Sequence, residues 1–326
     1  MAKLDPVKYS EFLHQIGKGM ELDFHEGGVL WQDRVFLEFP LFYAPPEIIL
    51  NGWIHSLLNY SDYVAIAPNE RNKEILSKNL KQLAKMLPDF DDKEHSISLY
   101  SNATPLRVRI EKNRKSQKFH VKFNSHKTIF PSYEIDLGRL QPSVINGKVL
   151  RSSYDTQILH DNGRVITAFI TCNQEYDTWV ESSLPFSLSV DVGVYVKTRA
   201  TPDVGGERVV IEAKEQEAGL YRAHLTENRK RLFCGYPTNF GKNGKNLYHQ
   251  YHIVSLLYLA RSSDIDDATR KKMLKYAHLW MSYTEKREKN GDHFVPYEDI
   301  LSTLNSHKFI IKYKSWEELL QWSKAL

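Results

Sequence analysis

One short stretch of the chain places an acidic side chain among aromatic and proline residues. Glu38 lies between Leu37 and Phe39 and is followed by Pro40. A carboxyl group in apolar surroundings has a raised pKa, which suits it to take up or release a proton in catalysis. The structural alternative is a surface glutamate or one that caps a nearby helix. Glu38 is therefore a candidate acid or base.

A second cluster combines phenol and imidazole groups at the start of a predicted helix. It contains Tyr248, His249, Tyr251 and His252. Helical spacing places positions 248, 251 and 252 on one face and directs His249 elsewhere. Histidines three residues apart can bind a metal, but no Asp or Glu accompanies them locally. A buried, hydrogen-bonded His252 is expected rather than a catalytic one, and we predict no metal site and no cofactor.

Several segments have the apolar period of helices and must position these groups. A helix is predicted over 6–20, ending near Gly17 and Gly19, and another over 46–63. The buried stripe of the second comprises Leu50, Trp53, Ile54, Leu57 and Leu58. The pattern over 69–87 predicts a third helix that Pro88 ends, and we expect it to form an antiparallel hairpin with the second. Helical period returns at 247–260, at 268–286 and near the C-terminus.

Between about 105 and 240 the period changes to alternation, which is typical of strands. Turn signals such as Asn146-Gly147, Asn162-Gly163 and Gly205-Gly206 separate the runs. Seven to nine short strands favour an antiparallel β-sandwich inserted between helical hairpins that share one core. We therefore predict an α+β protein with a discontinuous helical domain, 1–102 and 246–326, and an inserted β domain, 103–245.

The composition is that of a soluble globular protein. The 326 residues are 41% hydrophobic and 26% charged, with a formal net charge of +4. No apolar run approaches the ~18 residues that a membrane span needs. The N-terminus lacks the apolar core of a signal peptide, so a cytoplasmic location is expected.

The strongest charge feature lies between Arg107 and Lys127. This segment has eight Lys or Arg residues and one acid, Glu111, so its net charge is 8 − 1 = +7. Such a segment offers cations, including Arg109 and Lys112, to the carboxylates or sulfates of an acidic polysaccharide. The alternative is the solvated face of an edge hairpin. Nucleic acid is not the expected partner, because no recognised binding motif accompanies the charge.

Two groups of residues carry a family resemblance. Glu38-Phe39-Pro40 followed by Leu50-Asn51-Gly52-Trp53, and the run Asn246–Ile253, resemble the C-terminal domain of D-glucuronyl C5-epimerases, which modify heparan-type polysaccharides. The resemblance spans about 20–100 and 246–285. It implies an incomplete α/α toroid whose cleft is crossed by a uronate-containing chain.

The resemblance also implies roles for individual residues. Tyr248 matches a catalytic tyrosine of the family, Glu38 is the second acid/base candidate, and Tyr100 matches another family tyrosine. We assign substrate binding to Tyr43, Asn51, Arg109, Lys112, His249 and His252. Two positions depart from the family: Phe39 replaces a tyrosine, and Ser-Asn-Ala-Thr follows Tyr100 where the family has Asp-Leu-Arg-His.

The first functional hypothesis is an isomerase that removes the C5 proton of a uronic acid and returns one from the opposite face. This needs two acid/base groups and a cation or hydrogen-bond donors to stabilise the enolate. A phenol of ordinary pKa, about 10, acts as a base only near positive charge, which Arg34, Arg109 or Lys112 could supply. Loss of the 4-O substituent from the same enolate would make a polysaccharide lyase.

Two further hypotheses remain open. A non-catalytic module that binds an anionic glycan, or takes part in assembly, is favoured by the altered motifs. A glycoside hydrolase on a related scaffold would need a second carboxylate beside Glu38, for which Asp62 or Glu47 are candidates. A homodimer would cover the apolar helix faces that a short toroid leaves open.

Overall fold

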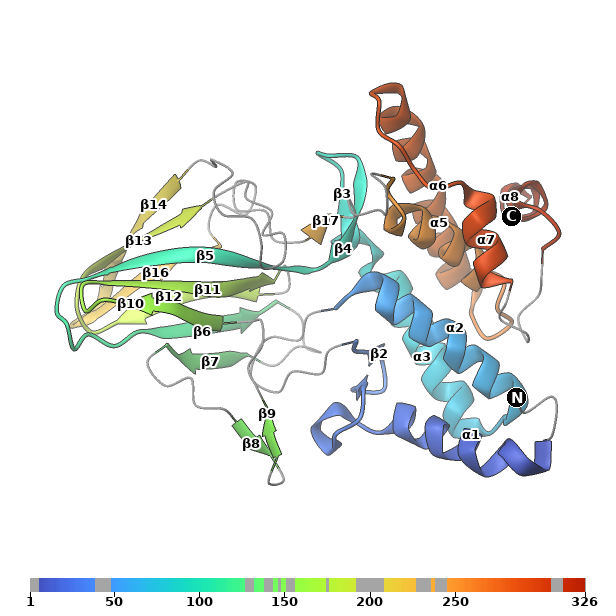
Figure 1. The fold of residues 1–326 in the computed structure, drawn as a ribbon, viewed down its shortest axis with the longest axis horizontal. Coiled ribbons are helices and arrows are strands. Elements are labelled where there is room, and N and C mark those ends of the chain that lie inside the picture. The colour runs from blue at the N-terminus through green and yellow to red at the C-terminus, as the bar shows by residue number, and fades with distance from the viewer. Residues whose placement is uncertain are drawn as a thin grey trace. The chain divides into compact units, whose positions relative to one another are not determined.

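The computed structural model describes residues 6–38, 48–126, 132–137, 143–145, 148–150, 156–173, 176–191, 208–226, 236–237, 245–305 and 313–325. The protein is α+β, as the sequence predicted. Its described residues fall into two compact units (Figure 1). The helical unit takes the described residues of Met1–Pro40, Ile48–Ser101 and Pro237–Leu326, and the β unit takes those of Asn102–Tyr236.

Seven α-helices are described. They are α1 (Pro6–Glu21), α2 (Leu50–Ile66), α3 (Glu70–Met86), α5 (Tyr248–Leu259), α6 (Asp267–Lys289), α7 (Tyr297–Leu304) and α8 (Trp316–Lys324). Helix α2 packs against α3 and α5, and α6 packs against α3 and α5, so segments far apart in sequence share one core. Among the described helices none is long and apolar enough to cross a membrane.

Helix α2 confirms its predicted apolar stripe, since Leu50, Trp53, Ile54, Leu57 and Leu58 are all fully buried. Its predicted start at residue 46 is wrong for Ile48 and Ile49, which precede the helix. Ile49 has extended backbone angles and forms an antiparallel bridge with Ser101. Pairing with a strand therefore takes the place of another helical turn.

Helix α3 begins with reciprocal hydrogen bonds between Asn69 and Asn72, which satisfy amide groups at its start. It ends at Met86, and Pro88 lies in the 3-10 helix Leu87–Phe90 that follows. The prediction that Pro88 ends this helix is therefore confirmed. The short α7 was not predicted. Its eight residues follow Pro296 and bury only Ile300, Leu301 and Leu304, which is too brief a pattern to identify in the sequence.

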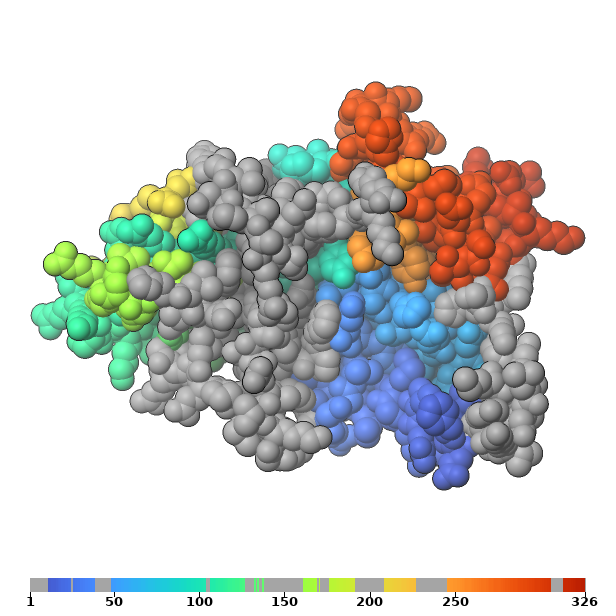
Figure 2. Space-filling model, viewed as in Figure 1, coloured from blue at the N-terminus to red at the C-terminus, as the bar shows by residue number. Residues whose placement is uncertain are grey.

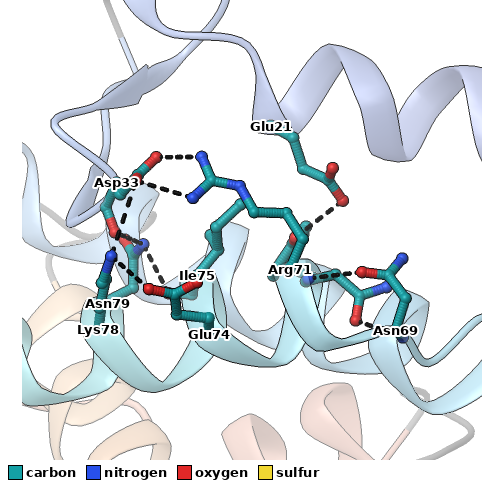
Figure 3. Close-up of polar contacts among 10 residues, drawn as sticks. Glu21, Asp33, Asn69, Arg71, Glu74, Ile75, Lys78 and Asn79 are labelled. Carbon is teal, nitrogen blue, oxygen red and sulfur yellow. Dashed lines mark hydrogen bonds and ion pairs between the residues drawn. The ribbon is translucent and has the colours of Figure 1, made fainter.

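A polar network connects α3 to the turn that contains Asp33 (Figure 3). The turn joins β1 (Leu30–Trp31) to β2 (Val35–Phe36), and Asp33 lies in it at a positive φ of 57°. Arg71 donates to both Asp33 carboxylate oxygens, at 2.6 and 2.9 Å. The side chain of Asn79 donates to the Asp33 carbonyl at 3.2 Å. These contacts hold a backbone conformation that most residues avoid.

Helix α1 forms part of the molecular surface (dark blue in Figure 2). Gly17 faces α2, where an added Cβ would overlap the ring of Tyr63. Two apolar side chains of α1 face solvent instead, Phe12 with 59% and Ile16 with 45% exposure. The predicted helix over 6–20 is confirmed, and these two apolar side chains stay outside the core.

The β unit contains two five-stranded antiparallel sheets. The first has the order β10-β11-β5-β13-β14 and the second β15-β16-β12-β6-β7. The first comprises β5 (Ala103–Lys112), β10 (Thr156–Asp161), β11 (Val165–Asn173), β13 (Phe186–Asp191) and β14 (Arg208–Glu212). The second comprises β6 (His120–Ser125), β7 (Tyr133–Asp136), β12 (Tyr176–Ser182), β15 (Lys214–Glu217) and β16 (Leu220–His224).

The remaining strands are short. β8 (Ser143–Ile145) pairs with β9 (Lys148–Leu150), and β17 is Tyr236–Pro237. In the helical unit β3 (Asp91–Asp92) pairs with β4 (Ile97–Ser101). Strand β4 was not predicted, and it matters because it places Tyr100.

Candidate functional site

Two sequence-predicted tyrosines meet in the helical unit. Tyr100 projects from β4 and Tyr248 from the first turn of α5, and their ring centroids are 5.0 Å apart at an interplanar angle of 61°. Both residues are half-buried. An edge-to-face pair of this kind fixes the relative orientation of the two rings. The structure thus brings together two phenols that are 148 residues apart in the chain.

The start of α2 adjoins the same strand. The bridge between Ile49 and Ser101 places the first residues of α2 beside the residue that follows Tyr100. Helix α5 contacts both α2 and β4. The starts of two helices and the end of one strand therefore meet around the tyrosine pair.

Glu38 lies against the first turn of α2. A Cβ added to Gly52 would overlap the Oε2 atom of Glu38 and would lie only 2.8 Å from its Cδ atom. The residue as a whole is exposed, yet partial burial of its carboxyl group raises the pKa above the ordinary value. Gly52 thus leaves room for a carboxyl group of the kind that acid/base chemistry requires.

Asn51 precedes that glycine and is half-buried. Its side-chain Oδ1 atom is buried with no hydrogen-bond partner among the described residues. An unmatched buried acceptor costs free energy unless something else satisfies it. The predicted substrate-binding role of Asn51 stays a prediction, and this oxygen is the atom through which it would act.

His249 and His252 are both fully buried. The Oγ atom of Ser98 lies 2.8 Å from His249 Nδ1 and 2.9 Å from His252 Nδ1, within hydrogen-bond distance of both rings. The prediction that His249 points away from His252 is wrong, because residues three apart on a helix are neighbours. Burial also argues against the predicted direct contact of either ring with a substrate.

Burial sets the charge of these groups. It lowers the pKa of His249 to about 3 and that of His252 well below the ordinary value, so both rings are neutral near pH 7. It raises the pKa of the Tyr251 phenol to about 12. Tyr251 is therefore a poor base, although it belongs to the same motif.

The basic segment is divided between two sheets. Arg109 and Lys112 lie on β5, whereas Lys122 lies on β6 of the other sheet. The edge-hairpin alternative is wrong, because β5 and β6 do not pair and each lies inside its own sheet. Lys112 donates to Asp161 Oδ2 at 2.7 Å, and only 4% of its side chain is exposed. Arg109 is exposed, opposite Thr167 and Ser189 on the neighbouring strands.

Other predicted residues have different outcomes. Tyr43, Glu47 and Phe39 lie outside the described residues. Arg34 is exposed in the turn before β2. Asp62 lies ten residues beyond Gly52 on α2, which is about 15 Å along the axis. That exceeds the ~5–9.5 Å between the carboxyl groups of glycoside hydrolases, so Asp62 does not suit the role of partner for Glu38.

Sequence reasoning missed Ser98 and Gly52. The available signal for Ser98 was its position two residues before Tyr100, which places both side chains on the same side of a strand. The signal for Gly52 was contained in the Leu-Asn-Gly-Trp motif. No group of three or more His, Cys, Asp or Glu side chains among the described residues could hold a metal ion.

Comparison with known proteins supports the resemblance. Residues 5–127 match the family model described as the D-glucuronyl C5-epimerase C-terminus, which confirms the predicted family relationship over this part of the chain. The match includes Glu38, Asn51, Gly52 and Tyr100, and it ends before Tyr248. No curated protein and no solved structure matches the chain at a significant level.

Proposed function

We propose that the protein is an enzyme that modifies a uronate-containing polysaccharide, as a glucuronyl C5-epimerase does. The observation that carries the proposal is the contact between Tyr100 and Tyr248. Tyr100 belongs to the segment that matches the epimerase family, and Tyr248 comes from outside it. A chain that had kept only the family scaffold would not need to hold this second phenol against the first.

The proposed reaction exchanges the proton at C5 of a glucuronate residue. Tyr248, as its phenolate, accepts the C5 proton from one face of the sugar and becomes a neutral phenol, while the electron pair of the C–H bond moves toward the carboxylate and an enolate forms. Glu38, in its acid form, returns a proton to C5 from the opposite face. The raised pKa of Glu38 suits this step, because a larger fraction of the carboxyl groups then carries a proton. Tyr100 is the alternative acid/base.

The two units take separate parts in this proposal. The helical unit is an incomplete α/α toroid that holds the reacting sugar, and the β unit is a sandwich that holds an anionic glycan. Arg109 is the cation that we assign to glycan binding, because it is exposed and Lys112 is paired with Asp161. The exposed Phe12 and Ile16 of α1 would be covered in a homodimer.

Proton NMR of heparosan incubated with the protein in deuterated water tests the reaction. Both N-deacetylated and unmodified heparosan are used. We expect deuterium at C5 with the unaltered protein and none with Tyr248→Phe. Tyr221→Phe is the control, because it removes a half-buried phenol from β16 in the other unit. An iduronate signal means an epimerase, and an unsaturated uronate signal means a lyase.

The second candidate is a module that binds an anionic glycan without catalysis. Phe39 and the Ser-Asn-Ala-Thr run after Tyr100 favour it, because a phenol and a guanidinium of the family are replaced. This module would bind heparosan, and Arg109→Ala would weaken the binding, with no C5 exchange in any variant. That result would refute the catalytic proposal for these substrates.

A further inference from the structure

Ser98 is a fully buried polar residue two positions before Tyr100 on β4. Side chains two apart on a strand project to the same side. Ser98 and Tyr100 therefore both face α5, whose first residue is Tyr248. Any contact that fixes Ser98 against α5 also fixes the distance between the two phenols.

Ser98 makes that contact with His249, the neighbour of Tyr248. The backbone N–H of Ser98 donates to His249 Nδ1 at 3.0 Å, and the Ser98 Oγ atom lies 2.8 Å from the same nitrogen. On the other side of the ring, His249 Nε2 lies 3.1 Å from the carbonyl oxygen of Trp280 on α6. The backbone N–H of His249 donates to Asn246 Oδ1 at 3.1 Å. The imidazole is thus held at both ring nitrogens and through its backbone.

Donor and acceptor rules determine the proton positions in this network. A backbone N–H can only donate, so His249 Nδ1 is the acceptor and His249 Nε2–H donates to Trp280. The Ser98 hydroxyl then donates to His249 Nδ1 and accepts from His252 Nδ1–H, 2.9 Å away. These bonds require a neutral His249 with its proton on Nε2. The neutral state of His252 follows from its burial, which disfavours a charged ring.

We propose that Ser98 is a positioning residue that sets the geometry of the Tyr100–Tyr248 pair through His249. The role rests on the proposed function, since it matters for catalysis only if these phenols react. Ser98 is separated from Tyr100 by one residue, and His249 adjoins Tyr248, so the hydrogen bond acts close to both rings. A displacement of about 1 Å at a reacting group can lower a rate by roughly a hundredfold.

The test is Ser98→Ala, which removes the hydroxyl and leaves the backbone N–H bond to His249. The matched control is Ser323→Ala, because Ser323 is also buried and its Oγ atom lies 3.0 Å from a histidine, His278. The ¹⁹F resonance of 3-fluorotyrosine at position 248 reports the orientation of the nearby Tyr100 ring without any substrate. Tyr100→Leu calibrates that resonance by removing the ring.

We expect Ser98→Ala to move the ¹⁹F resonance toward its position in Tyr100→Leu, and Ser323→Ala to leave it unchanged. In the C5-exchange assay kcat falls about tenfold or more while KM stays within about threefold, as for a misplaced catalytic group. An unchanged resonance in folded Ser98→Ala protein would overturn the positioning role. If the unaltered protein exchanges no C5 proton, the proposed function fails, and the ¹⁹F comparison still decides whether Ser98 orients Tyr248.

Discussion

Asn79 on α3 is hydrogen-bonded both to α2, whose first turn adjoins the site, and to the turn that contains Asp33. The free energy of unfolding lost on its removal can be worked out from these bonds. The residue is fully buried. Its Oδ1 atom accepts from Trp53 Nε1 at 3.2 Å, and its Nδ2 atom donates to the carbonyls of Asp33 and Ile75. Trp53 is fully buried on α2, so no water replaces the lost acceptor in Asn79→Ala.

The magnitude follows from the groups left without partners. An unsatisfied buried donor such as Trp53 Nε1–H costs about 1–3 kcal/mol. The Asp33 carbonyl belongs to a half-buried turn that water can reach. Losing the hydrogen bond from Asn79 to this carbonyl therefore costs less, on the order of 0.5–1 kcal/mol. The Ile75 carbonyl keeps its helical hydrogen bond. We therefore expect Asn79→Ala to lower the free energy of unfolding by about 1.5–4 kcal/mol.

Urea denaturation followed by circular dichroism at 222 nm measures this change in the helical unit. The control is Asn59→Ala, because Asn59 is exposed on α2 and its amide donates to a carbonyl of the same helix, that of His55. It should change the free energy by less than about 0.5 kcal/mol.

A double-mutant cycle isolates the hydrogen bond. In a Trp53→Phe background no indole N–H is left unsatisfied, so Asn79→Ala should cost about 1–2 kcal/mol less than in the unaltered protein. Equal costs in the two backgrounds would refute the assignment of this energy to the Trp53–Asn79 bond.

Three further predictions concern Glu38, the Asp33 turn and the β unit. Gly52→Ala should leave the melting temperature unchanged or higher, because alanine favours a helix, yet lower the C5-exchange rate at least tenfold by displacing Glu38; an unchanged rate would argue against a role for Glu38. Hydrogen bonding by Arg71 lowers the pKa of Asp33, so its carboxylate stabilises the fold above the unfolded pKa of about 3.9, and this contribution is lost as the pH falls through the lower folded pKa. Urea titrations at pH 6 and pH 3 should show Asp33→Asn less stable than the unaltered protein at pH 6, by under about 1 kcal/mol for so exposed a pair, with the gap closing at pH 3. Lys112→Ala should lower the stability of the β unit in thermal denaturation without weakening heparosan binding, since its ammonium group is already paired; a loss of binding with unchanged stability would contradict this.

Local patterns were sufficient for the elements whose signal lies within one turn or one strand. The period of α2 predicted which side chains are buried, and Pro88 predicted where α3 ends. The start of α2 was misplaced because Pro45 and Pro46 suit a helix start in the sequence, whereas the bridge between Ile49 and Ser101 depends on a partner far along the chain. Strand β4 was missed for a different reason, because its five residues give too short an alternation to distinguish it from a loop.

The two halves of the site show the same limit. Tyr100 and Tyr248 could each be named from a short motif, but no window of sequence contains both. The basic segment looked like one patch because its charges are consecutive in sequence. Pairing placed β5 and β6 in different sheets, and ion pairs with Asp161 and Glu181 occupy Lys112 and Lys122. Charge along a chain therefore predicted the number of cations without predicting which of them are available.

The histidine pair shows where a helical pattern can be taken further. Positions 249 and 252 are about 60° apart around a helix, so one small polar group can contact both rings. The sequence contained that pair, and its burial could be expected from the apolar run that follows. The third member could not be found in the same way, because Ser98 precedes His249 by 151 residues and is joined to it only when β4 packs on α5. A buried pair of neutral imidazoles in a predicted helix therefore indicates that a donor or acceptor from another element lies between them.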